Sequence, residues 1–297
     1  MRTVALRPHA LLPGRYDQRK VLATTVDAWG RALWLVCPEA ELRPNPYGRP
    51  SPHPRTDPYD ALLVVADGGT FRELPLRDIT LRVSRLDALP NGRLVLYGYE
   101  AAGDRNAQIY GRDGRRRRRF ALGSAVEFLM ADRRHHLWSA YGDEGVYSDP
   151  LSAPGLVRWD SGGNRRWGYS APKGVEYIDT VYAFNVGDGV AWASYYPTFP
   201  LLEARADGRI RLRRSPVAAP SGLAVDGDRL VMLGGDRQPD RLQRCRLTAD
   251  EVLPVEEARL TLPDGTPLKR YAPCVGRGRH LYVRGRSRGQ WYVTSVR

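Results

Sequence analysis

The stretch SGLAVDGDRLVMLGG, residues 221–235, decides the fold class. A short apolar segment reaches the pair Asp226-Gly227, and the chain returns as the aliphatic run LVML. Asp-Gly pairs are favoured in two-residue hairpin loops because those turns need residues that tolerate positive φ. The stretch therefore predicts a β-hairpin with two largely buried strands.

The same form recurs along the chain, with an apolar strand, a short turn and a second strand that starts with an aliphatic residue. The other copies are residues 24–36, 84–98, 127–141, 181–195 and 272–286. Most are followed by a second hairpin whose returning strand is polar and rich in arginine, at 60–76, 107–122, 155–169 and 201–215. Four antiparallel strands per unit, repeated six times, predict an all-β, six-bladed β-propeller that occupies residues 1–297 as a single domain.

The last unit is one strand short, because only QWYVTSVR (290–297) follows its hairpin. The segment RTVALRP (2–8) alternates apolar and polar residues and can supply the missing strand. We therefore expect the N-terminal strand to join the last blade and close the ring, which removes exposed strand edges. Deletion of residues 1–10 is then expected to lower stability.

The stretch PSGLAVDGDRLVMLGG (220–235) resembles the repeat of six-bladed propellers of the NHL and SMP-30/gluconolactonase type. The metal-dependent members of that group use carboxylates and asparagines near the channel, including an asparagine where this chain has Ser221. The departure disfavours a metal, and no cofactor is expected. Glu127, Asp179 and Asn185 remain candidate oxygen ligands if a divalent cation binds.

Charge and composition bear on partners. The net charge is +13, and the basic residues are almost all arginine, with lysine only at 20, 173 and 269. The arginines are spread over every segment, apart from the run 115–119, so they favour attraction of anionic ligands over one nucleic-acid-binding element. The three cysteines have no metal-ligand spacing and are expected to be buried. No apolar run reaches membrane-span length and the N-terminus lacks a continuous apolar signal segment, so a cytoplasmic location is expected.

The long insertions fall in one kind of loop. They are 37–60, which is rich in proline, 99–107, 142–154, 197–200 and 235–240. In a four-stranded blade these connections between second and third strands all lie on the same face. Because long loops on a rigid scaffold often carry binding residues, that face is the expected binding face.

Six polar or aromatic side chains at this face are the candidate ligand-binding residues: Asp143, Glu144, Tyr147, Asp179, Tyr195 and Tyr196. Adjacent residues of a strand point to opposite sides, so Asp143 and Glu144 are not expected to act as a carboxylate pair. No nucleophile elbow or nucleotide-binding loop occurs.

Three functions stay open. The first is binding of a small molecule or a protein at the loop-rich face. The second is a hydrolase or lactonase activity that uses channel carboxylates, and the third is nucleic-acid binding through arginine. The sequence leaves catalysis undecided.

Overall fold

The computed structural model describes residues 2–39, 42–43, 53–54, 58–100, 105–235, 238–270, 272–287 and 289–297. Nearly all regular structure in these ranges is β-strand, and the helical elements include the short α-helix α1 (Asp143–Val146) and the 3-10 turns η1 (Gly14–Tyr16) and η3 (Pro90–Gly92). Within the described ranges no helix is long and apolar enough to cross a bilayer.

The strands form groups that we number one to six along the chain. Group one is β3 (Arg19–Val26), β4 (Ala32–Pro38), β7 (Tyr59–Asp67) and β8 (Thr70–Ile79). Group two is β9 (Leu81–Leu89), β10 (Arg93–Glu100), β11 (Ala107–Tyr110) and β12 (Arg116–Phe120). Group three is β13 (Val126–Ala131), β14 (His136–Tyr141), β15 (Leu156–Asp160) and β16 (Arg165–Gly168).

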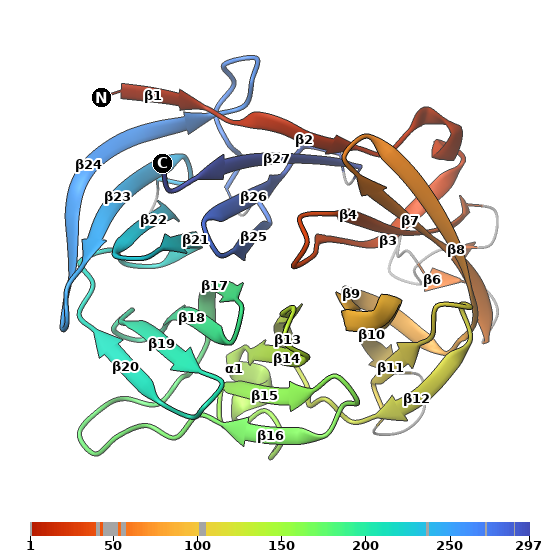
Figure 1. Cartoon of the computed structure of the whole chain (residues 1–297), viewed down its shortest axis with the longest axis horizontal. Coiled ribbons are helices and arrows are strands. Elements are labelled where there is room, and N and C mark those ends of the chain that lie inside the picture. The colour runs from red at the N-terminus through yellow and green to blue at the C-terminus, as the bar shows by residue number, and fades with distance from the viewer. Residues whose placement is uncertain are drawn as a thin grey trace.

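The second half repeats the pattern. Group four is β17 (Val181–Gly187), β18 (Val190–Tyr195), β19 (Leu201–Arg205) and β20 (Ile210–Arg213). Group five is β21 (Pro220–Asp226), β22 (Arg229–Gly234), β23 (Arg241–Leu247) and β24 (Val252–Thr261). Group six is β25 (Cys274–Arg277), β26 (His280–Arg284), β27 (Gln290–Ser295) and the N-terminal β2 (Arg7–Leu11). Figure 1 shows the groups arranged in order around a common centre, with the first strand of each nearest to it.

The N-terminal segment serves two groups. β1 (Arg2–Ala5) pairs in parallel with β24, whereas β2 pairs antiparallel with β27, from Arg7↔Val293 to Leu11↔Gln290. Figure 1 shows this segment running along the outside of both groups. The sequence predicted one strand over 2–8, and the structure divides the segment between two sheets.

The apolar core lies between neighbouring groups. Separate clusters of buried side chains join groups one and two, two and three, three and four, four and five, and five and six. A further cluster joins group six to group one and contains Trp34, Tyr282 and Trp291. The aromatic residues Trp34, Trp138, Trp192 and Tyr282, which recur in the second strands, are all buried in these clusters.

The aspartates of the repeat shape its hairpin turns. One carboxylate oxygen of Asp27 accepts hydrogen bonds from the backbone amides of Trp29 and Arg31, two and four residues on. In the same way, Asp132 and Asp160 each accept hydrogen bonds from the backbone amides of the residues two and four positions further along the chain. Each carboxylate thus satisfies turn amides that would otherwise lack a partner.

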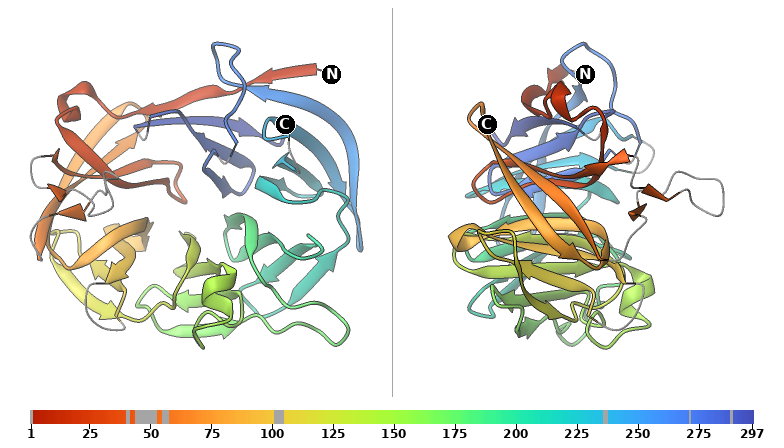
Figure 2. Two further views of the ribbon diagram at one scale, coloured as in Figure 1. Left: turned by 180° about the vertical axis from the view of Figure 1, so that it is seen from behind. Right: turned by 90° about the vertical axis from the view of Figure 1, so that its right-hand side faces the viewer.

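The insertions all lie between second and third strands of their groups. The side view in Figure 2 shows α1 and the short hairpin β5 (Leu42–Arg43)–β6 (His53–Pro54) projecting on the same side of the molecule. Most of the proline-rich insertion 37–60 lies outside the described residues. The run 115–119 falls largely in β12, the outermost strand of group two, where charge discourages pairing with another sheet edge.

Candidate functional site: a basic central cavity

A cavity of about 880 Å³ lies where the first strands of the groups begin. Its wall comes mainly from residues 22–25, 82–86, 127–130, 219–221 and 272–275. The start of each first strand is at the same end of the group as the loop between second and third strands, and the β22–β23 loop contributes Gly235, Gln238 and Pro239. The cavity therefore opens on the loop-rich face predicted from the sequence.

The described lining of this cavity is strongly basic. It contains five basic side chains, Arg82, Arg85, Lys269, Arg270 and Arg284, and one carboxylate, Glu127. Arg85 holds that carboxylate: its Nε donates to the Glu127 carbonyl oxygen at 2.9 Å, and its guanidinium lies 3.5 Å from Glu127 Oε2. Arg82 and Lys269 are exposed at the cavity and form no ion pair with a carboxylate of the described ranges. An excess of positive charge in a concave site concentrates anions there.

Aromatic side chains line another part of the wall. Phe128 and Tyr182 line the cavity from groups three and four, and Phe128 lies 5.6 Å from Phe184 between ring centroids. Tyr182 packs edge-on with Phe199 at 5.1 Å, and Phe199 packs in turn with Tyr196 at 5.9 Å. The rings of groups three and four thus support one another next to the cavity.

A cysteine and a tryptophan complete the wall beside the cations. Burial raises the pKa of the Cys274 thiol to about 12, so the thiol stays protonated and apolar at neutral pH. Trp291 donates its indole N–H to Thr24 Oγ1 at 2.9 Å, which connects group six to group one. All three cysteines are buried thiols, as expected from the sequence.

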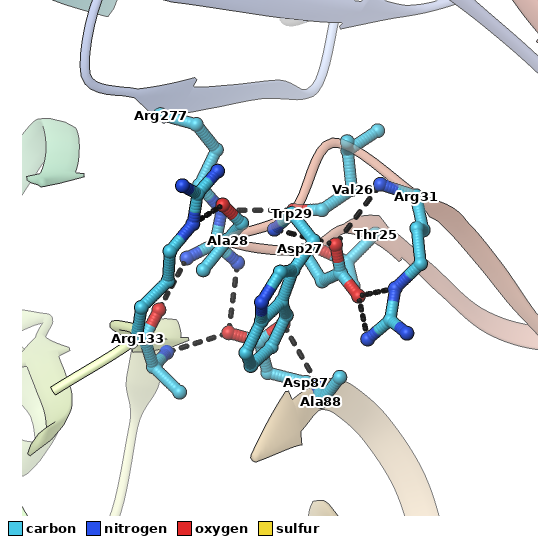
Figure 3. Close-up of polar contacts among 11 residues, drawn as sticks. Thr25, Val26, Asp27, Ala28, Trp29, Arg31, Asp87, Ala88, Arg133 and Arg277 are labelled. Atoms are coloured by element: carbon cyan, nitrogen blue, oxygen red, sulfur yellow. Dashed lines mark hydrogen bonds and ion pairs between the residues drawn. The ribbon is translucent and has the colours of Figure 1, made fainter. Parts of the chain in front are cut away.

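Toward the opposite ends of the first strands, Arg277 links four groups. Its Nε donates to the Val26 carbonyl at 2.8 Å, one terminal nitrogen donates to the Ala131 carbonyl at 2.8 Å, and the other lies 2.7 Å from Asp87 Oδ2. These partners belong to groups one, three and two, whereas Arg277 belongs to group six. Figure 3 shows the guanidinium reaching toward the turns of the other groups. We call Arg277 and Asp87 the axial pair.

Asp87 is fully buried, and its carboxylate is further satisfied by the backbone amides of Ala88 and Ala131. Burial raises its pKa to about 6, and the neighbouring Arg277 acts in the opposite direction. At neutral pH the pair is therefore ionised and hydrogen-bonded in a dry environment.

Asn185 connects the remaining groups. Its side-chain amide donates to the carbonyls of Leu223 and Gly278, and its oxygen accepts from the Gly278 amide at 3.1 Å. Together with the axial pair, these bonds reach all the groups. The side-chain amide of Asn185, a candidate metal ligand by sequence, is therefore hydrogen-bonded to backbone groups.

The structure brings several predicted site residues together outside the cavity. The Tyr147 hydroxyl donates to Asp179 Oδ2 at 2.6 Å and lies 2.9 Å from the Tyr177 hydroxyl. Asp143 is anchored nearby, because its amide donates to the Thr180 hydroxyl at 3.0 Å. These contacts fasten the loop that contains α1 to the segment before group four.

The remaining predicted residues are dispersed. Asp143 and Glu144 lie in α1 rather than on a strand, and both are exposed. Tyr195 is fully buried, with its hydroxyl 3.3 Å from that of Tyr169, whereas Tyr196 is 46% exposed beside Phe199. None of the six candidates is among the described lining residues of the cavity.

The three candidate metal ligands are likewise separate. Glu127 lines the cavity with Arg85, Asp179 bonds Tyr147 and Thr180, and Asn185 bonds backbone. Across the described residues, no group of three or more His, Cys, Asp or Glu side chains is placed to hold a metal ion.

Glu127 is the one candidate from the sequence that lines the cavity; the cationic and aromatic lining residues were not predicted, because the expected ligand-binding residues lay in or beside the loops. Arg82 and Tyr182 lie near the starts of first strands, and Lys269 lies in the segment before β25. One signal was present: lysine is rare here, so Lys269 just before the last hairpin departs from the arginine bias.

The fold has counterparts among solved structures, although no family model and no curated protein matches the chain. The chain is similar to Hsv2 of Kluyveromyces lactis, with 10% identity and a TM-score of 0.56 over 94% of this chain and 75% of that one. It is also similar to virginiamycin B lyase of Staphylococcus aureus in complex with quinupristin, with 13% identity and a TM-score of 0.52 over 98% and 99%. At such low identity the likeness concerns the fold alone. The chain has the fold of a β-propeller.

Proposed function

We propose that the protein is a six-bladed β-propeller, of the NHL and SMP-30/gluconolactonase type, that binds an anionic small molecule in its central cavity. In this proposal the six groups are the blades and β2 closes the ring by completing the last one. The cluster shared by groups six and one, with Trp34 and Trp291, supports closure. The pairing of β2 with β27 supports it as well.

The charge of the cavity supports an anionic ligand. Its described lining contains five basic side chains and one carboxylate, and that carboxylate already interacts with Arg85. The volume of about 880 Å³ falls in the range of roughly 300–1,000 Å³ that is usual for small-molecule sites. A cavity of this size and charge suits an organic anion better than a long polyanion, which needs an open groove.

The hydrolase alternative has less support. A carboxylate mechanism needs a general acid and a general base near each other, yet Glu127 is the one carboxylate in the described lining. The nucleic-acid alternative rests on the arginine run 115–119, which lies largely on β12. This is the outermost strand of group two, and β11 and β10 separate it from β9, the strand that lines the cavity. Ligand binding is therefore the function we adopt.

A charge-removal variant tests this function. We expect the double substitution Arg82→Ser, Lys269→Ser to weaken the binding of citrate by at least about tenfold, because it removes from a concave site two cations that form no ion pair within the described ranges. Isothermal titration calorimetry of the full chain at low salt measures the change. The matched control is Arg116→Ser, Arg117→Ser on the outer strand β12, which removes the same charge far from the cavity. Equal citrate affinity in the two double variants would contradict the proposal.

A further inference from the structure

The cavity has two chemically different walls. Its cations lie at groups two and six, which flank group one on either side. Group two carries Arg82 and Arg85, whereas group six carries Arg284 and follows the segment that contains Lys269 and Arg270. Group one contributes no charged residue to the described lining between them, where residues 22–25 are leucine, alanine and two threonines. The positive charge is therefore concentrated on one half of the ring.

The other half of the wall is aromatic and uncharged apart from Glu127. Phe128 and Tyr182 occupy groups three and four, and group five contributes small residues such as Ala219, Ser221 and Gly234. Tyr182 remains 41% exposed even though Phe199 packs against it. A large aromatic ring with that much surface beside a cavity can contact a ligand without any rearrangement.

The support behind Tyr182 is specific. Phe199 has a φ of 53°, a left-handed conformation that is unfavourable for a residue with a side chain. Its amide donates to the Tyr195 carbonyl at 2.9 Å, so the backbone holds it in this conformation. The strained position places its ring perpendicular to that of Tyr182, with an interplanar angle of 88°. Strain of this kind is typically retained where it positions a functional group.

From this asymmetry we propose that the ligand is an aryl anion, with its negative group on the side of Arg82 and Lys269 and its planar ring against Tyr182. The inference rests on the proposed function and adds that the anionic ligand carries an aromatic ring. A small inorganic anion would use the cationic half alone and would leave the aromatic half of a cavity of about 880 Å³ unoccupied. An organic anion with a ring contacts both halves at once.

Three probes separate the two parts of the ligand: naphthalene-2-sulfonate, methanesulfonate, which has the same charged group without the ring, and naphthalene-2-methanol, which has the ring without the charge. We expect naphthalene-2-sulfonate to bind at least about tenfold more tightly than either of the others. Tyr182→Ala should remove about tenfold of that affinity and leave the affinity for methanesulfonate unchanged, whereas Tyr182→Phe should retain it. Tyr177→Ala is the matched control, because Tyr177 is a 56% exposed tyrosine outside the described cavity lining.

The outcomes are distinct. If the two sulfonates bind equally and both weaken in Arg82→Ser, Lys269→Ser, the aryl inference is overturned while anion binding stands. If no sulfonate binds, or if the charge variant binds both as tightly as the native chain does, the proposed function fails and the inference fails with it. If Tyr177→Ala weakens naphthalene-2-sulfonate as much as Tyr182→Ala does, the ring does not lie in the cavity and the inference is overturned.

Discussion

Replacing Arg277 by methionine should lower the free energy of unfolding by roughly 3–5 kcal/mol at about pH 8, because it leaves a buried carboxylate without its counter-ion. Asp87 is fully buried, and Arg277 is its ion-pair partner at 2.7 Å. The substitution also removes the donors to the carbonyls of Val26 and Ala131, so groups one, two and three lose the bonds that Arg277 makes to them. Urea unfolding followed by far-ultraviolet circular dichroism measures the change.

The loss should depend on pH in a defined direction. Burial raises the pKa of Asp87 to about 6 in the folded protein, above the ordinary value, and removal of Arg277 raises it further. A carboxyl group with a raised pKa in the folded state contributes stability when it is protonated, and that contribution is lost as pH rises through the folded pKa. The variant should therefore be less destabilised at about pH 5 than at about pH 8.

Two further variants isolate the buried charge. The double substitution Arg277→Met, Asp87→Leu should recover most of the lost stability, because it removes both charges from the dry site. Arg279→Met is the matched control: Arg279 lies two residues away and forms an exposed ion pair with Asp226 at 3.5 Å. It should cost less than about 1 kcal/mol. Equal losses for Arg277→Met and Arg279→Met, at both pH values, would refute the role of the axial pair.

The sequence predicts the strand pattern well because the physics behind it is local. An aspartate that caps turn amides, a glycine with positive φ and an alternating apolar strand all act within a few residues, as at Asp226-Gly227 and Asp132. The location of the long loops follows from counting strands. These features were sufficient to predict an all-β propeller with one loop-rich face.

The axial pair and the cavity could not be predicted in the same way. Arg277 differs in no local respect from Arg279, the other arginine in GRGRH, and its function depends on partners 146–251 residues away. The stretch YGDEGVYSDP (141–150) shows the converse. Asp143, Glu144 and Tyr147 of this stretch are candidate ligand-binding residues by sequence, but much of the segment serves to fasten its own loop through α1 and the bond from Tyr147 to Asp179.

The second large effect concerns the N-terminus. The side chain of Leu6, between β1 and β2, is 2% exposed and belongs to the cluster shared by groups five and six. The backbone amide of Leu6 donates to Thr261, and that of Leu12 donates to Gly289, so the segment is bonded at both ends of β2. The ring of His9 also packs against Tyr282 at 4.7 Å. Removal of residues 1–11 would therefore strip a buried leucine and two strand pairings from the last two groups.

We expect the truncated chain to melt roughly 10 °C lower than the full chain, since the loss of a buried leucine alone costs about 2–5 kcal/mol. It should also aggregate, because β27 and β24 would become exposed edges. Leu6→Ala and Leu11→Ala provide a matched pair in the full chain: the buried leucine should cost about 2–5 kcal/mol, whereas Leu11 is 59% exposed and its replacement should change little. A synthetic peptide of residues 2–12 should restore part of the melting temperature of the truncated chain. A truncated chain that stays monomeric and melts at the temperature of the full chain would show that β2 does not close the ring.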